Sequence, residues 1–287
     1  DVEKPADCPD GYIWLKTSDG NSGPSGMGFD HSSMTAESTT GHWSDGYPPD
    51  SDKDYFLGKN ATLATPNNNS VVAGYIYRFG GRSLYFGNGG SVKFCHKNTS
   101  VADFGENVTI AGSASFTFPA MSSGTPTTRA KATIRDNGWI SFDDGATADK
   151  RSCYLEWALT GGDSTSVSFS ENAGQTAIWY WCGDCSAFYG KLILRARDSV
   201  TTESNNSVLV ISNVTVAGSV EIQKYETLRM LGANSSVGGL VDIKQLAAFE
   251  VSGGHMTMVG SLNLDGTLKF VDATRKYGTL ILDTRKT

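Results

Sequence analysis

The side chains best suited to hold a ligand lie in a short aromatic segment that ends at Tyr189. In a β-strand, Ile178 and Tyr180 share one face, and Trp179 and Trp181 share the other. If the first pair fills the core, the two indole rings face solvent, where rigid aromatic rings commonly hold sugar rings or protein partners. We therefore expect ligand binding at Trp179, Trp181 and Tyr189. The alternative is that a lateral loop covers the indoles.

Two sets of carboxylates could bind a cation. Asp143 and Asp144 precede a glycine, and adjacent carboxylates on a β-helix can hold calcium. An Asp-Gly turn accounts for the same residues. The second set places four carboxylates within ten residues, at Asp45, Asp50, Asp52 and Asp54. We therefore expect no cofactor other than a calcium ion at one of these sets.

The cysteines predict a disulfide. Five cysteines leave at least one without a disulfide partner. Residues one repeat apart in a solenoid lie about 4.8 Å from each other, close enough for a disulfide. Cys153 precedes Cys182 by 29 residues, so we expect Cys153 to be bridged to Cys182 or Cys185. Cys182 and Cys185 also have the spacing of a redox motif, but without the βαβ pattern that such a motif needs.

A repeated strand pattern must position these groups. Pairs of apolar residues separated by one spacer recur along the chain, and successive pairs start 24, 24, 27, 25, 28, 21, 21 and 18 residues apart. Such a period is typical of a solenoid, in which each unit buries its apolar face only against its neighbours. We predict an all-β, right-handed parallel β-helix; a β-sandwich is the alternative. The pairs are Val92/Phe94, Phe116/Phe118, Ile140/Phe142, Val167/Phe169, Leu192/Leu194, Val220/Ile222, Val241/Ile243, Leu262/Leu264 and Leu280/Leu282.

The pattern also predicts the organisation of the chain. Residues 1–63 form an N-terminal segment and cap, and residues 64–287 form the solenoid. Because the last apolar pair lies close to Thr287, we expect the solenoid to continue beyond this residue, or its open end to be covered by a partner or by end-to-end assembly.

The order of motifs between residues 41 and 94 resembles the start of large exported bacterial surface proteins that continue into autotransporter-like β-strand repeats. The motifs are Trp43-Ser-Asp-Gly, Pro48-Pro49, Asp54-Tyr55, Leu63-x-Thr-Pro66 and a Gly-Gly-x-Ser-Leu strand. This resemblance implies a secreted or cell-surface β-helical passenger, and it carries over no catalytic residue. Asp1 in place of Met is consistent with a chain whose export signal has been removed.

Composition and motifs narrow the function classes. The formal net charge is −6, and no run of basic residues is longer than a pair, which argues against a nucleic-acid partner. No apolar run reaches the ~18 residues of a membrane-spanning helix, so we expect no membrane insertion by this chain. No serine-hydrolase, zinc-protease or phosphate-loop motif occurs.

We therefore expect a non-enzymatic, exported cell-surface protein whose loops bind an extracellular glycan or protein. One alternative is a carbohydrate-active β-helix enzyme, a polysaccharide lyase or glycosidase. It should show either two carboxylates ~5–10 Å apart in a cleft or calcium with a nearby Lys or Arg base. The other is a structural component of a surface assembly.

Overall fold

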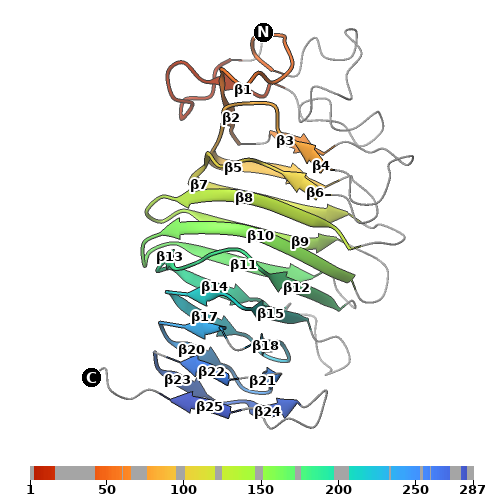
Figure 1. Ribbon diagram of the computed structural model, residues 1–287. Helices are drawn as coiled ribbons and strands as arrows, with labels where there is room; N and C mark the ends of the chain where they lie inside the picture. Colours follow the sequence, from red (N-terminus) through yellow and green to blue (C-terminus); the bar gives the residue numbers. More distant parts are fainter. Residues whose placement is uncertain are drawn as a thin grey trace.

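The computed structural model is an elongated stack of β-strands (Figure 1). It describes residues 3–16, 43–59, 61–65, 76–94, 101–119, 125–145, 151–171, 176–196, 207–232, 234–252, 255–258, 260–271 and 279–282. Across these ranges every regular element is a β-strand, and every pairing between strands is parallel. The predicted all-β parallel solenoid is therefore confirmed.

The strands, in chain order, are β1 (Ile13–Trp14), β2 (Asp54–Leu57), β3 (Thr62–Ala64), β4 (Ile76–Arg78), β5 (Ser83–Lys93), β6 (Val101–Asp103), β7 (Val108–Pro119), β8 (Thr127–Ile134), β9 (Trp139–Gly145), β10 (Arg151–Gly161), β11 (Ser166–Glu171), β12 (Ala177–Trp181), β13 (Ala187–Phe188), β14 (Lys191–Leu194), β15 (Val208–Ser212), β16 (Thr215–Val216), β17 (Ser219–Ile222), β18 (Thr227–Leu231), β19 (Ser236–Val237), β20 (Val241–Ile243), β21 (Ala248–Ser252), β22 (His255–Met258), β23 (Leu262–Leu264), β24 (Thr267–Val271) and β25 (Thr279–Leu282).

The strands form columns that run along the length of the molecule. The first column is β3, β5, β7, β9, β11, β14, β17, β20 and β23. The second is β4, β6, β8, β10, β12, β15, β18, β21 and β24. A shorter column of β16, β19, β22 and β25 forms its own sheet. From β14 onward, each turn of the chain adds one strand to each of the three columns.

Alternation of side chains along each strand builds the core. In the first column one inward row reads Leu63, Val92, Phe116, Phe142, Phe169, Leu194, Ile222, Ile243 and Leu264. Phe116, Phe142 and Phe169 stack with ring centroids 5.3 and 5.8 Å apart. The row is fully buried as far as Ile243, whereas Leu264 is 38% exposed. This inward row is therefore less buried at β23 than in the strands before it.

Most of the predicted pairs stack in the expected register. From Ile140/Phe142 to Leu262/Leu264, both members of each pair align with those of the next. Val92 aligns with Phe116, but Phe116 aligns with Phe142 instead of Ile140, so the first two pairs are displaced by one alternation. Leu280/Leu282 stacks on Met256/Met258 in the third column. The spacing of the pairs in the sequence reveals neither the displaced register of the first two pairs nor the change of column at Leu280/Leu282. The reason is that the lengths of the strands and of the turns change together.

The expected division after residue 63 does not interrupt the strand pairing. β3 includes both residues 63 and 64 and pairs with the second half of β5, while β2 pairs with its first half. β1 in turn pairs with β2. The described residues on both sides of this boundary therefore belong to one sheet. The N-terminal cap remains a prediction, and residues 283–287 lie outside the described residues.

The turns that lead into the first-column strands β14, β17, β20 and β23 are tightly packed. Gly190, Gly218, Gly239 and Gly260 lie there, and a Cβ atom on any of them would overlap backbone of an adjacent turn of the solenoid. Gly218 shows the contact most clearly, because its Cβ would overlap the carbonyl oxygen of Gly190. Asn137, in the turn between β8 and β9, has a φ of 61°, which this residue type tolerates.

Candidate ligand-binding site

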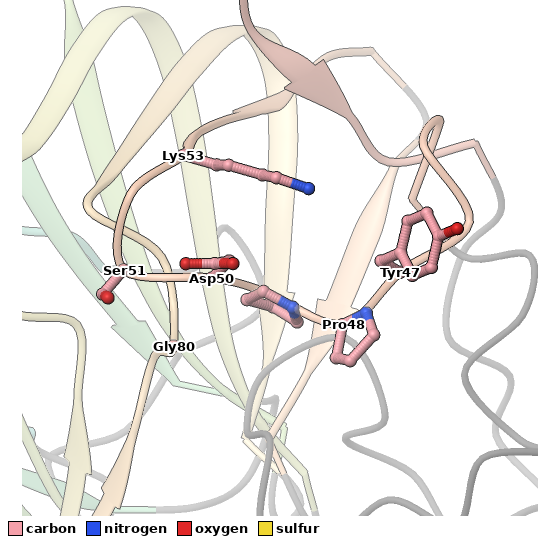
Figure 2. A pocket seen from close by; sticks show the side chains of 7 residues that line it. Tyr47, Pro48, Asp50, Ser51, Lys53 and Gly80 are labelled. Carbon is pink, nitrogen blue, oxygen red and sulfur yellow. The ribbon is translucent and has the colours of Figure 1, made fainter.

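A hollow lies beside the loop that precedes β2 (Figure 2). Its volume is about 590 Å3, and its lining residues are Tyr47, Pro48, Pro49, Asp50, Ser51, Lys53 and Gly80. Tyr47 is 65% exposed, the largest exposed fraction among the exposed apolar and aromatic side chains of the described residues. The hollow thus combines a solvent-facing ring with polar groups.

The loop is attached to the core by its first residue. The Trp43 side chain is fully buried and meets the Tyr55 ring edge-on, with centroids 4.7 Å apart. A turn follows, in which Gly46 has a φ of 77° and donates its N–H to the Trp43 carbonyl at 3.0 Å. The Tyr47 N–H then bonds to Asp45 Oδ1 at 3.1 Å. These contacts hold the backbone from which the Tyr47 ring projects.

Lys53, which lines the hollow, belongs to a charged pair. Lys53 Nζ lies 2.9 Å from Asp45 Oδ2 and 5.5 Å from the centre of the Tyr47 ring. Figure 2 shows the Lys53 side chain extending toward Tyr47. The hydrogen bond to Asp45 raises the pKa of Lys53, so the ammonium group stays charged. Because Asp45 balances its charge, Lys53 can donate a hydrogen bond to a ligand without requiring an anionic one.

The floor of the hollow is supported from the core. The Asp50 N–H donates to the Tyr55 hydroxyl oxygen at 2.8 Å, and burial raises the pKa of Tyr55 to about 12. The Arg82 N–H donates to the Lys53 carbonyl at 2.9 Å. A Cβ atom on Gly80 would lie 2.9 Å from the Pro49 carbonyl oxygen, so this close approach requires glycine. The polar groups are therefore held in place before any ligand arrives.

The structure separates the four carboxylates expected to bind calcium near this loop. Asp45 pairs with Lys53, and Asp50 Oδ1 accepts the Asp52 N–H at 3.0 Å. Asp54 pairs with Arg82 and accepts the Ser83 hydroxyl at 2.7 Å, and the Arg82 hydrogen bond lowers the pKa of Asp54. No group of three or more His, Cys, Asp or Glu side chains among the described residues could hold a metal ion.

Asp143 and Asp144 are also separated, because neighbouring residues on a strand point to opposite faces. Asp143 faces outward and accepts hydrogen bonds from the hydroxyls of Ser115, Ser141 and Ser170. Asp144 is 2% exposed and faces inward. The expectation that Asp143 and Asp144 jointly hold calcium is therefore wrong.

The prediction for the aromatic segment is wrong for its two indoles. Trp179 and Trp181 are fully buried, because β12 aligns them with Cys153 and Leu155 of β10 and with Leu209 and Ile211 of β15. Ile178 and Tyr180 face outward instead, and Tyr180 stacks on Tyr154 with ring centroids 4.6 Å apart. A slip of one residue in a strand exchanges its two faces.

Tyr189 lies apart from both indoles. It is 62% exposed, in the turn between β13 and β14.

The expected disulfide is absent from the described residues. The residue that stacks on Cys153 is Trp179, not a cysteine. Cys182 lies three residues further on, where its N–H donates to the Leu155 carbonyl, and neither it nor Cys185 is bridged to Cys153. Burial raises the pKa of the Cys185 thiol to about 12, which makes it a poor nucleophile and a poor redox group.

Sequence reasoning also missed an acidic pair in the core. Glu171 and Glu226 are buried, and both bind Ser207: the Ser207 hydroxyl donates to Glu171 and its N–H to Glu226, each at 2.7 Å. Burial, followed by the charge of Glu171, raises the pKa of Glu226 to about 9. No sequence signal marks this pair, since the two residues are 55 positions apart (226 − 171).

For Tyr47, the Pro-Pro that follows it was the signal that could have indicated a rigid, exposed ring.

No protein-family model, curated protein or solved structure matches the chain. Within the described ranges, no helix is long and apolar enough to cross a membrane.

Proposed function

We propose that this chain is a non-enzymatic scaffold at the cell surface that binds a sugar unit of an extracellular glycan in the hollow beside Tyr47. The observation that carries the proposal is the exposed Tyr47 ring above polar groups that the protein already holds in place. A sugar ring presents an apolar face that stacks on an aromatic ring and hydroxyl groups that bond to polar side chains. Asp50, Ser51 and Lys53 supply such side chains.

Two observations favour binding over glycan hydrolysis. Of the two aspartates beside Tyr47, Asp45 is engaged by Lys53, and Asp50 accepts a backbone N–H. A glycosidase needs an acid whose pKa is raised within a cleft. Glu226 has such a raised pKa, but it is fully buried in the core and does not line the hollow.

The cell-surface part of the proposal rests on the resemblance of residues 41–94 to exported surface proteins. The parallel solenoid is compatible with it, because a long rigid column presents its loops away from an attachment point.

A glycan array tests the proposal directly. We expect the wild-type chain to bind a defined set of glycans, Tyr47→Ala to weaken this binding about tenfold, and Tyr47→Phe to retain most of it because the ring remains. Tyr180→Ala is the matched control, since it removes a tyrosine from the outer face of β12. Absence of binding by the wild type, or equal binding by Tyr47→Ala, would refute the proposal.

A further inference from the structure

Two exposed aromatic rings lie along one corner of the solenoid, away from the hollow. Trp139, the first residue of β9, is 42% exposed, and Tyr189, in the turn before β14, is 62% exposed. Trp139 aligns with Ser166, and Ser166 aligns with Lys191, two residues after Tyr189. The two aromatic residues are thus separated by two turns of the solenoid, about 10 Å along its axis.

Buried neighbours and hydrogen bonds hold the backbone at this corner. The residues adjacent to the two rings, Ile140 and Phe188, are fully buried in the core. The Tyr189 N–H donates to the Gly161 carbonyl at 2.8 Å, and the Ser166 N–H donates to the Gly138 carbonyl at 3.2 Å. Binding to these rings would therefore cost little conformational entropy in the backbone.

Polar groups accompany the rings, and their charges favour a neutral ligand. The turn that ends at Trp139 carries the exposed Asp136, and the next turn carries the exposed Asp163. Two cations lie nearby, and each already has a partner. Arg135, in the same turn as Asp136, donates to the Tyr85 hydroxyl oxygen at 3.2 Å and lies 5.2 Å from the centre of that ring, and Lys191 is paired with Glu221 at 3.2 Å. An acidic ligand would meet the exposed carboxylates of Asp136 and Asp163 here, whereas hydroxyl groups could bond to them.

We propose that this corner binds a neutral polysaccharide whose chain runs parallel to the solenoid axis, with sugar rings stacked on Trp139 and Tyr189. A single sugar ring cannot contact both aromatic residues across two turns, so the site requires an oligosaccharide. The surface is separate from the hollow beside Tyr47, and the proposal does not depend on that site.

Calorimetric titration with neutral hexasaccharides (cello-, xylo-, manno- and laminari-) tests the proposal. We expect at least one to bind the wild-type chain, and Trp139→Ala or Tyr189→Ala to weaken that binding about tenfold each. Glucose and hexagalacturonate should bind at least tenfold more weakly than the best neutral hexasaccharide.

Leu240→Ala is the matched control, because Leu240 is an exposed apolar side chain one turn beyond Ser219 on the same corner. Equal weakening in this variant would indicate a general apolar contact with a protein partner and would overturn the proposal. So would the absence of binding to all four neutral ligands, a preference for hexagalacturonate, or unchanged binding in the Trp139→Ala/Tyr189→Ala variant. Loss of hexasaccharide binding in Tyr47→Ala alone would support the hollow and refute the corner. Circular dichroism confirms that each variant is folded.

Discussion

Glu226 should make the stability of the protein depend on pH in an unusual direction. Most acidic residues stabilise a fold in their ionised form, but this carboxyl is fully buried beside Glu171, and its pKa is raised from 4.5 to about 9. A folded-state pKa above the unfolded value means that the stabilising contribution is complete below pH 4.5. It is lost progressively as the pH rises through about 9.

The size of the effect follows from proton linkage. Between the two pKa values, the folded chain holds one proton that the unfolded chain has released, so the free energy of unfolding falls by ~1.36 kcal/mol per pH unit. Raising the pH from 5.5 to 7.5 should therefore lower this free energy by about 2.7 kcal/mol (2 × 1.36) through Glu226. Glu226→Gln should lack this loss, because glutamine keeps an acceptor for the Ser207 N–H and does not ionise.

Urea unfolding followed by tryptophan fluorescence at both pH values measures the difference. The quantity of interest is the free energy of unfolding of the wild type minus that of Glu226→Gln, which should fall by about 2.7 kcal/mol between pH 5.5 and 7.5. Glu106→Gln, which changes an exposed carboxyl, should show the pH dependence of the wild type. Parallel pH profiles for the wild type and Glu226→Gln would refute the reasoning.

Three further predictions test the packing. Gly218→Ala should lower the free energy of unfolding by about 1–3 kcal/mol, because its methyl group overlaps Gly190. Gly162→Ala, whose methyl group meets a single atom at 3.6 Å, should leave the free energy of unfolding nearly unchanged. Equal urea midpoints for the two variants would contradict the close packing at Gly218. Trp179→Ala should cost about 3–5 kcal/mol of stability through the cavity it leaves, and an unchanged melting temperature would show that the indole is not a core residue. In native protein, iodoacetamide should modify the exposed Cys182, whereas the buried Cys185 should react only after unfolding; mass spectrometry that finds equal rates would contradict this difference.

The solenoid could be predicted from the sequence because its signal is local and repeated. Pairs such as Val167/Phe169 and Val220/Ile222 each mark a strand that buries alternate residues, and their regular return indicates stacking. The candidate sites were less predictable. Tyr189 was expected to be available for a ligand and is exposed, but Tyr47 and Trp139 were not identified, because a single aromatic residue in a turn has no periodic neighbours.

The hollow beside Tyr47 depends on contacts that the sequence pattern does not encode. Gly80 approaches Pro49, and the Tyr55 hydroxyl supports Asp50, only once β2 and β5 are paired. The acidic set near this loop shows the same limitation. Because its four aspartates are close together in the sequence, one cation site was predicted. The fold instead gives Asp45 and Asp54 different cationic partners.

The sequence by itself determined that this chain forms strands with alternating buried residues and that these strands return at the spacing of a stacked column. Only the tertiary structure decided which face of β12 is buried, because both of its faces carry large apolar or aromatic side chains. Its local pattern is therefore ambiguous. Hydrogen bonding to β10 and β15 sets the register, and this register places Trp179 and Trp181 inside and Tyr180 outside.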